Sequence, residues 1–224
     1  FTDALQACTG YISFCSMGAD VGDVNADGWP DIMSLDMAFE EYEKSKTNMG
    51  SMDPERFWGI VADHQHYQYM QNALQVNMGH GYFSDMAPLA GVTKSDWSYS
   101  SLFADLDIDG DQDILITNGV LRDLQNNDFN TMVKERYQGM VGPENYLEIL
   151  KNLPSNPVPN VIFTNEGDLH FSKLGPEGGF ATPGFSHGMA YADFDGDGKL
   201  DVVVNNMNAP VSLYKNVTET DGHY

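Results

Sequence analysis

Basic residues are scarce in this sequence. Only 11 of the 224 residues are lysine or arginine, against 33 aspartates and glutamates, and the formal net charge is −22. Binding to the backbone of a nucleic acid requires clusters of basic side chains. An anionic membrane surface attracts the same kind of cluster. The composition therefore argues against nucleic acids and anionic membranes as partners.

Cysteines and long apolar segments are also rare. Cys8 and Cys15 are the only cysteines, and a disulfide in an oxidising compartment and two buried thiols are both compatible with their spacing. No run of about 20 apolar residues occurs, which is the length needed to cross a bilayer. We therefore expect no transmembrane segment in this chain.

What the sequence does contain is one acidic nine-residue pattern in three copies, at residues 23–31, 105–113 and 193–201. We call these segments loop one, loop two and loop three. Oxygen-bearing side chains stand at positions 1, 3, 5 and 9, glycine stands at position 6, and position 7 is free to contribute a carbonyl oxygen. Alternate oxygen ligands around a sharp glycine turn are how a short loop surrounds a hard cation. The predicted ligands are Asp23, Asn25, Asp27, Trp29, Asp31, Asp105, Asp107, Asp109, Asp111, Asp113, Asp193, Asp195, Asp197, Lys199 and Asp201.

Calcium fits this pattern better than magnesium, which demands tighter octahedral geometry and keeps its waters. The pattern predicts about three Ca²⁺ sites, and an acidic surface turn is the alternative for any single copy. An EF-hand is excluded because position 12 is Ser34, Ile116 or Val204 instead of glutamate, and short β-type runs follow each loop.

The repeat extends beyond the loops. A serine lies seven residues before each loop and a turn residue thirteen residues after its first aspartate, at Ser16, Ser98 and Ser186 and at Asp36, Asn118 and Asn206. Residues 72–83 and 160–171 read as a strand, an Asn/Gly turn and a strand, and residues 212–216 repeat this in shortened form. Four short strands per repeat are typical of a β-propeller blade.

We therefore expect an all-β fold made of four-stranded antiparallel blades with short helical insertions, and only part of a propeller in this chain. The loops are 82 and 88 residues apart, whereas a bare blade needs roughly 40–50. The predicted division is the end of a preceding blade at 1–12, a blade at 13–85 with an insertion at 38–71, a blade at 86–173 with an insertion at 119–159, and an incomplete blade at 174–224. The remaining blades would come from the same protein or from other copies.

The insertions carry the candidate ligand-binding residues. Aromatic rings offer large contact areas to a sugar or a protein, and the candidates are Phe57, Trp58, Tyr67, Tyr69 and Tyr137. The alternative is that these rings attach the insertions to the blades. His64 and His66 are interpreted as a surface or hydrogen-bonded pair in preference to a transition-metal site, and His187 as a structural residue.

The residues 103–115 and 192–204 resemble the FG-GAP/VCBS repeat, which builds integrin-α-like calcium-binding propellers. The fuller pattern, with Asn72 to Phe83, Ala90 to Val92 and Trp97 to Ser98, is similar to ASPIC/UnbV-type surface proteins of Bacteroidota. This resemblance implies the same metal ligands, with Asn25 as a departure that removes one charge. It also implies an extracellular or outer-membrane location, with a lipid anchor compatible with a chain that does not start at methionine.

Three functions are compatible with these observations. We favour a calcium-stabilised extracellular module that binds a protein or a glycan at the cell surface. A structural subunit of an outer-membrane or cell-surface complex comes second. A polysaccharide-active lyase or hydrolase comes third, because the paired carboxylates are committed to the loops and no catalytic motif occurs elsewhere.

Overall fold

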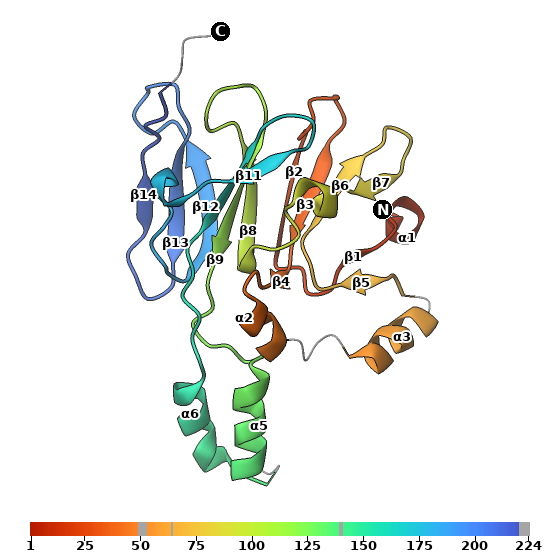
Figure 1. Ribbon diagram of the computed structural model, residues 1–224, viewed down its shortest axis with the longest axis vertical. Coiled ribbons are helices and arrows are strands. Elements are labelled where there is room, and N and C mark those ends of the chain that lie inside the picture. Colours follow the sequence, from red (N-terminus) through yellow and green to blue (C-terminus); the bar gives the residue numbers. More distant parts are fainter. Residues whose placement is uncertain (49–52, 64, 139–140, 220–224) are drawn as a thin grey trace.

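The computed structural model describes residues 1–48, 53–63, 65–138 and 141–219. Within these residues the chain is mostly β-structure, arranged as sheets that stand side by side with helices at one end (Figure 1). This confirms the predicted fold class, an all-β partial propeller with short helical insertions.

The first blade is a four-stranded antiparallel sheet. Its strands follow the chain in the order β2 (Gly18–Gly22), β3 (Asp31–Leu35), β6 (Ala73–Asn77) and β7 (Phe83–Asp85). Loop one connects β2 to β3, as the acidic pattern between two apolar runs predicted. Loops one, two and three therefore belong to the hairpins that begin each sheet.

The second blade repeats this order, and its first two strands are longer than those of the first blade. It consists of β8 (Asp96–Ala104), β9 (Asp113–Asn118), β10 (Val161–Asn165) and β11 (Phe171–Lys173). A short strand of the first repeat, β4 (Met37–Ala38), pairs with the start of β8 and makes this a five-stranded sheet. The two repeats are thus joined by strand pairing as well as by packing.

The third blade has three strands among the described residues, which are β12 (Ser186–Ala192), β13 (Asp201–Asn206) and β14 (Ser212–Tyr214). The shortened hairpin that the sequence predicted at 212–216 corresponds to β14 and the residues after it. The predicted boundaries between repeats remain predictions.

Helices occupy the insertions. The first insertion holds α2 (Tyr42–Thr47), α3 (Pro54–Ala62) and β5 (Gln68–Tyr69), and the second holds α5 (Asn127–Arg136) and α6 (Pro143–Asn152). Asp53 caps α3 by accepting the N–H of Glu55, and Asn126 caps α5 by accepting that of Phe129. These caps explain why the helices begin where they do.

Residues 1–3, which open the segment predicted as the end of a preceding blade, form no strand. A strand requires a hydrogen-bonded neighbour, and no strand pairs with these residues in the described part of the chain. The helix α1 (Leu5–Cys8) follows them as α4 (Ala87–Ala90) follows β7, and β1 (Ile12–Ser13) then pairs in parallel with β5. A further short helix, η2 (Pro176–Gly178), follows β11.

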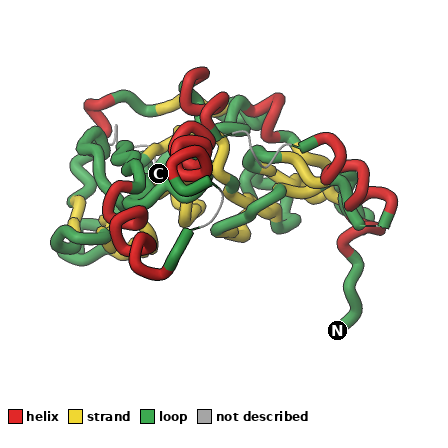
Figure 2. Tube along the Cα trace, turned by 90° about the horizontal axis from the view of Figure 1, so that it is seen from below, coloured by secondary structure: helices red, strands yellow, loops and turns green. Residues whose placement is uncertain are grey.

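Strand alternation separates two ends of the molecule. Because consecutive antiparallel strands reverse direction, the loops after β2, β8 and β12 lie at one end and the insertions at the other (Figure 1). We call these the loop end and the insertion end. Viewed from the insertion end, the helices stand in front of the strands (Figure 2).

The apolar core lies between neighbouring blades, whose sheets pack face to face. The larger cluster joins Met33 and Leu74 of the first blade to Ile114 and Phe163 of the second. A smaller one joins Leu115 of the second blade to Val202 and Val204 of the third. The second blade buries both faces this way, which explains the continuous apolar run of its strand β9.

Candidate metal centres in three repeated loops

The three loops share one backbone conformation. The glycines at position 6 have φ of +87° (Gly28), +99° (Gly110) and +87° (Gly198), and no atom lies within 4 Å of an added Cβ at any of them. Glycine is therefore required here by the left-handed backbone and not by lack of space. Position 4 is also left-handed in each loop, at Ala26, Ile108 and Gly196.

The aspartate at position 1 holds each loop closed. In loop two, Oδ1 of Asp105 accepts the N–H of Asp109 at 3.2 Å, and Oδ2 accepts that of Gly110 at 3.1 Å. Asp23 and Asp193 make the corresponding pairs of bonds. The N–H groups, first that of Gly198, lower the pKa of Asp193. The side chains at positions 3 and 5 are thereby turned toward one another.

Two of the loops gather three carboxylates each. One oxygen from each of Asp105, Asp107 and Asp109 lies within 4.8 Å of the others, and the same holds for Asp193, Asp195 and Asp197. In loop one, Asn25 stands at position 3 and its Nδ2 donates to Oδ2 of Asp27 at 3.0 Å. Loop one therefore concentrates less negative charge than the other two.

Loop two meets a stringent test of fit to a cation. Oδ1 of Asp107 is buried and has no hydrogen-bond partner among the described residues. Burial raises the pKa of this carboxyl, and the negative charge of Asp109 raises it further. A buried, unpartnered oxygen is costly, and a hard cation held by oxygen ligands would remove that cost. The donor set suits Ca²⁺, which would be held by Asp105, Asp107 and Asp109.

The aspartates at position 9 have a different environment from the one predicted for them. Asp31, Asp113 and Asp201 are 0, 2 and 3% exposed, and they are not members of the three-carboxylate clusters. Each accepts two backbone N–H groups, one from position 2 of its own loop and one from an asparagine at the end of the third strand. For Asp113 these donors are Leu106 at 3.1 Å and Asn165 at 2.9 Å.

These buried carboxylates retain lone pairs beyond the two N–H bonds, so their participation in metal binding remains a prediction. Burial raises the pKa of Asp113 to about 6, against the opposing effect of the two N–H donors. Burial also raises the pKa of Asp31. Their observed role is to fasten each loop to the third strand of its blade.

Asparagines continue this network from blade to blade. Nδ2 of Asn165 in the second blade donates to the carbonyl oxygen of Val24 in loop one at 2.9 Å. Nδ2 of Asn216 in the third blade likewise donates to the carbonyl oxygen of Leu106 in loop two at 2.7 Å. The loop end is therefore tied together by one repeated contact. The repeat of these asparagines is visible in the sequence, but their contacts across blades are not.

The residues at position 7 point their N–H groups at the loop. Trp29, Asp111 and Lys199 each donate to Oδ1 of the position-5 aspartate, at 2.8 to 3.0 Å. Nζ of Lys199 lies away from the carboxylates and donates to the carbonyl oxygen of Thr218 at 2.6 Å. The predicted use of their carbonyl oxygens as ligands remains a prediction.

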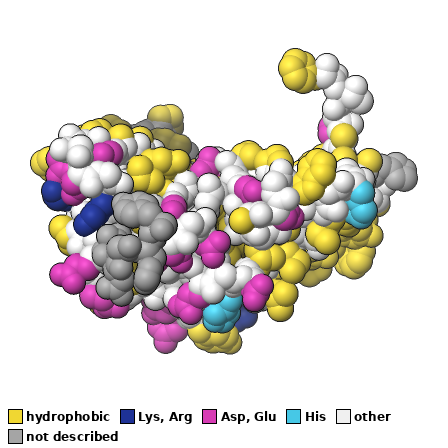
Figure 3. All heavy atoms as spheres, turned by 90° about the horizontal axis from the view of Figure 1, so that it is seen from above, with side chains coloured by type: hydrophobic (Ala, Val, Ile, Leu, Met, Phe, Trp, Pro, Cys, Tyr) yellow, Lys and Arg dark blue, Asp and Glu magenta, His cyan; other side chains and the backbone are white. Residues whose placement is uncertain are grey.

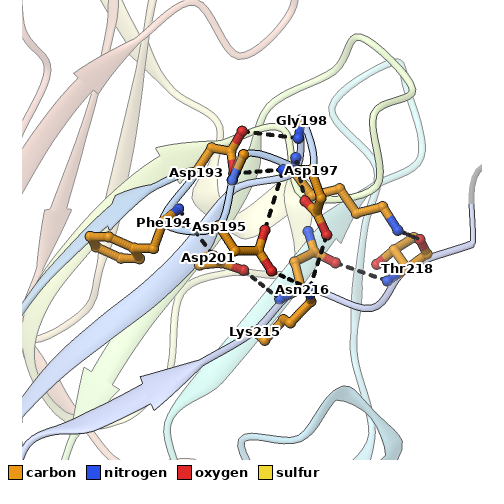
Figure 4. Close-up of polar contacts among 11 residues, drawn as sticks. Asp193, Phe194, Asp195, Asp197, Gly198, Asp201, Lys215, Asn216 and Thr218 are labelled. Atoms are coloured by element: carbon orange, nitrogen blue, oxygen red, sulfur yellow. Dashed lines mark hydrogen bonds and ion pairs between the residues drawn. The ribbon is translucent and has the colours of Figure 1, made fainter.

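Lys215 is the functional residue that sequence reasoning missed. Its Nζ contacts Asp195 and lies 3.3 Å from Oδ2 of Asp197, so that an ammonium group stands against the carboxylates of loop three (Figure 4). The hydrogen bonds that Lys215 donates to Asp195 and Asp197 raise its pKa. No local pattern marks this lysine, since it follows β14 and lies 20 residues from Asp195 in the chain.

Acidic side chains are spread over the loop end, with few basic ones between them (Figure 3). The rest of the titratable candidates lie elsewhere. His66 forms a hydrogen bond with Oγ1 of Thr9 at 2.8 Å, whereas His64 lies outside the described residues. Cys8 and Cys15 are free thiols, and burial raises the pKa of Cys15. The ring of His187 stacks on Tyr99 with centroids 4.0 Å apart.

Four of the five aromatic candidates form one group at the insertion end. The ring of Phe57 lies 5.2 Å from Trp58, 6.4 Å from Tyr67 and 5.6 Å from Tyr69, between centroids. We call these four residues the aromatic platform. Tyr137 belongs to the other insertion, where Arg136 lies 5.5 Å above its ring. Whether any of the five binds a ligand remains a prediction.

A cavity of about 700 Å³ opens beside the second blade, near its junction with the third. Its walls include Ile162, Leu174 and Phe180, and its rim carries Glu40 and Lys173. The two rim charges are paired with each other, since Nζ of Lys173 lies 2.7 Å from Oε1 of Glu40. The cavity therefore offers a mainly apolar surface with little free charge.

Comparison with known proteins agrees with this geometry. The family model of the FG-GAP-like repeat matches residues 147–204, which include β10, β11, β12 and the whole of loop three. An FG-GAP-like repeat is therefore present in the chain, and such repeats are typical of extracellular proteins. No helix in the described segments is long and apolar enough to span a membrane.

Among curated proteins, cartilage acidic protein 1 of Homo sapiens is similar to a part of the chain. The two are 42% identical over 57 residues, which is 25% of this chain and 9% of the human protein. The chain thus matches a small part of that relative's length. The match supports a shared repeat and does not carry over the activity of a whole protein.

Proposed function

We propose that this chain is part of a calcium-stabilised extracellular β-propeller that acts as an interaction module for a protein or a glycan. The observation that carries the proposal is the carboxylate cluster of loop two, with the buried and unpartnered Oδ1 of Asp107 inside it. The FG-GAP-like repeat supports the extracellular location. The cell surface, including the outer face of an outer membrane with or without a lipid anchor, is part of the proposal.

Electrostatics supports a role for the cation in stability. Two carboxylates 4–5 Å apart repel by about 3–4 kcal/mol at an effective dielectric constant near 20. A divalent cation removes this repulsion and satisfies the orphaned oxygen. Loops with such ligands in extracellular modules bind Ca²⁺ with dissociation constants of about 10⁻⁴–10⁻³ M. Extracellular calcium is in the millimolar range, so the sites would be largely filled outside the cell.

Calorimetric titration and thermal unfolding of the whole chain test the proposal. We expect calcium to bind with measurable heat and to raise the melting temperature relative to excess chelator, because a ligand bound only by the folded state stabilises it. Asp107→Asn should weaken one site, since it removes a charge and places an amide nitrogen among the carboxylates. The matched control is Asp168→Asn, an exposed aspartate in the turn after β10.

The outcome that contradicts the proposal is an unchanged melting temperature and no heat of binding at millimolar calcium. Magnesium serves as a second comparison, because its octahedral preference predicts weaker binding at the same loops. Equal stabilisation by sodium at matched ionic strength would indicate simple screening of the acidic loop end.

We place the proposed partner contact at the insertion end. The aromatic platform supports this, since Trp58 is 62% exposed and the rings of Tyr67 and Tyr69 are partly exposed beside it. Aromatic rings of this kind provide contact area for sugars and proteins at a low cost in entropy. The platform is far from the loops, so calcium would act on the partner through stability and not through contact.

A second proposed contact is a further blade on the open face of the third blade. Leu213 and Phe194 are 65 and 53% exposed. They correspond in the repeat to Ile162 and Leu106 of the second blade, which pack in the core shared with the third blade. The carbonyl oxygen of Phe194, which has no side-chain donor among the described residues, would accept an asparagine Nδ2, as those of Val24 and Leu106 do. Replacing Leu213 with lysine should therefore weaken assembly of the complete propeller.

A further inference from the structure

Loop three differs from the other loops by the lysine that faces it. Nζ of Lys215 contacts a carboxylate oxygen of Asp195 and lies 3.3 Å from Oδ2 of Asp197. Both aspartates belong to the cluster that would hold the cation. The ammonium group of Lys215 is therefore the counter-charge for two of the three carboxylates in the cluster (Figure 4).

The backbone next to this lysine is fixed. The N–H of Asn216 donates to Oδ1 of Asp201 at 2.9 Å, and its Nδ2 donates to the carbonyl oxygen of Leu106 at 2.7 Å. The side chain of Lys215 is 55% exposed. It can therefore turn into solvent without disturbing the blade, while its Cα remains beside the loop.

The other blades have no basic residue at the corresponding position. The residue before the third-strand asparagine is Val76 in the first blade and Thr164 in the second. The second lysine near loop three is also different, because Nζ of Lys199 bonds to the carbonyl oxygen of Thr218. Lys215 is thus the basic residue that meets the carboxylates of its loop.

We infer that Lys215 is a tethered competitor for the cation of loop three, which neutralises the loop without metal and must leave before Ca²⁺ binds. This inference rests on the proposed calcium binding and concerns the regulation of one site. Of the two loops that gather three carboxylates, loop three then binds calcium more weakly, and it fills at a higher calcium concentration than loop two. The blade keeps its folded loop when calcium is low.

The test is calcium titration of the whole chain and of the variant Lys215→Met, which keeps an unbranched side chain and removes its charge. We expect one site to bind calcium about tenfold more tightly in Lys215→Met, because two exposed ion pairs no longer have to be broken before the cation enters. Lys151→Met, the matched control, removes an exposed lysine of α6 at the insertion end and should change affinity by less than about twofold.

A second measurement separates competition from a merely structural contact. In excess chelator, Lys215→Met should melt at a lower temperature than the parent chain, because the carboxylates lose their counter-charge. In saturating calcium the two melting temperatures should be equal, or Lys215→Met should melt at the higher temperature. A structural contact alone would lower the melting temperature under both conditions, and that result would overturn the inference.

Two further variants assign the effect to its loop. Adding Asp195→Asn to Lys215→Met should remove the tightened site, and Thr164→Lys should weaken the site of loop two. If calcium binds but Lys215→Met leaves every affinity unchanged, the inference fails while the proposed function stands. If the parent chain and both lysine variants bind no calcium, the proposed function fails as well.

Discussion

Asn165 of the second blade is hydrogen-bonded to Val24 of loop one, with Nδ2 lying 2.9 Å from the carbonyl oxygen. The N–H of the same Val24 donates to Asp31, and the N–H of Asn165 donates to Asp113. The N–H of Val24 is thus bonded within its own blade, and its carbonyl oxygen is bonded to the next blade. The acidic loops and the packing of the blades are therefore parts of one hydrogen-bonded system.

We expect Asn165→Ala to destabilise the chain by about 1–3 kcal/mol, because it leaves the buried carbonyl oxygen of Val24 without a donor. Asn77→Ala is the matched control. Asn77 makes the same contacts within its own blade, to the carbonyl oxygen at position 8 and to the N–H two residues on, but it has no described contact to another blade. Urea unfolding of both variants measures the difference, and equal losses would show that the contact between blades contributes nothing.

A glycine at position 6 is needed for its backbone conformation alone. Gly110 has φ of +99° and open space around an added Cβ, so Gly110→Ala should cost about 1–2 kcal/mol of backbone strain without any clash. Gly59→Ala is the control, since Gly59 lies inside α3 and also has open space. Alanine should stabilise that helix by about 0.5–1 kcal/mol. Thermal unfolding distinguishes the expected destabilisation by Gly110→Ala from the expected stabilisation by Gly59→Ala. A Gly110→Ala variant with an unchanged melting temperature would contradict the assigned loop conformation.

The free energy of unfolding should depend on pH through Asp36, and the burial of its carboxyl sets the direction of the change. The side chain is fully buried, and burial raises the pKa of its carboxyl above the usual 3.8, although the N–H groups of Cys15, Met37 and Phe14 oppose this. The folded chain therefore holds this proton more tightly than the unfolded chain. The contribution of Asp36 to stability is full at low pH and is lost as the pH rises through the raised pKa.

We expect Asp36→Asn to flatten the fall in unfolding free energy as the pH rises above the usual aspartate pKa of 3.8, measured in the presence of chelator. The reciprocal variant is Asn118→Asp, because Asn118 occupies the corresponding buried position in the second blade, where it accepts the hydroxyl of Ser98 at 2.8 Å. This substitution should make the fall steeper. Identical slopes for the parent chain and Asp36→Asn would contradict the assignment.

Local patterns in the sequence predicted the fold class, because the loops depend on residues close together in the chain. Alternating oxygen side chains and glycine at position 6 define loop two without reference to any other segment. The repeated serine and asparagine were also visible as spacings. The hydrogen bond between them could not be predicted from spacing, since Ser98 and Asn118 come into contact only when β8 pairs with β9.

The sequence could not predict contacts that depend on the register between strands. Asp113 looks like any other acidic ligand in its loop, but the N–H of Asn165, 52 residues later, takes one of its oxygens. Lys215 reaches Asp195 across 20 residues. Tyr137 was named with Phe57 as a candidate ring although the sequence placed it in the second insertion, and its ring contacts Arg136 there.

The aromatic platform yields a prediction that separates binding from packing. Phe57 contacts the rings of Trp58, Tyr67 and Tyr69 and is only partly exposed. We therefore expect Phe57→Ala to loosen the first insertion and to lower the melting temperature. Trp58 is 62% exposed, so Trp58→Ala should leave the melting temperature nearly unchanged and should reduce retention on an array of glycans.

Tyr146 provides the control for this experiment, because it is 59% exposed on α6 and lies in the other insertion. Tyr146→Ala should retain the binding of the parent chain, which excludes a general effect of losing one exposed ring. A platform that serves only to attach the insertion predicts the opposite outcome. In that case Trp58→Ala and the parent chain would bind the same glycans equally, and the contact surface would have to lie away from α3.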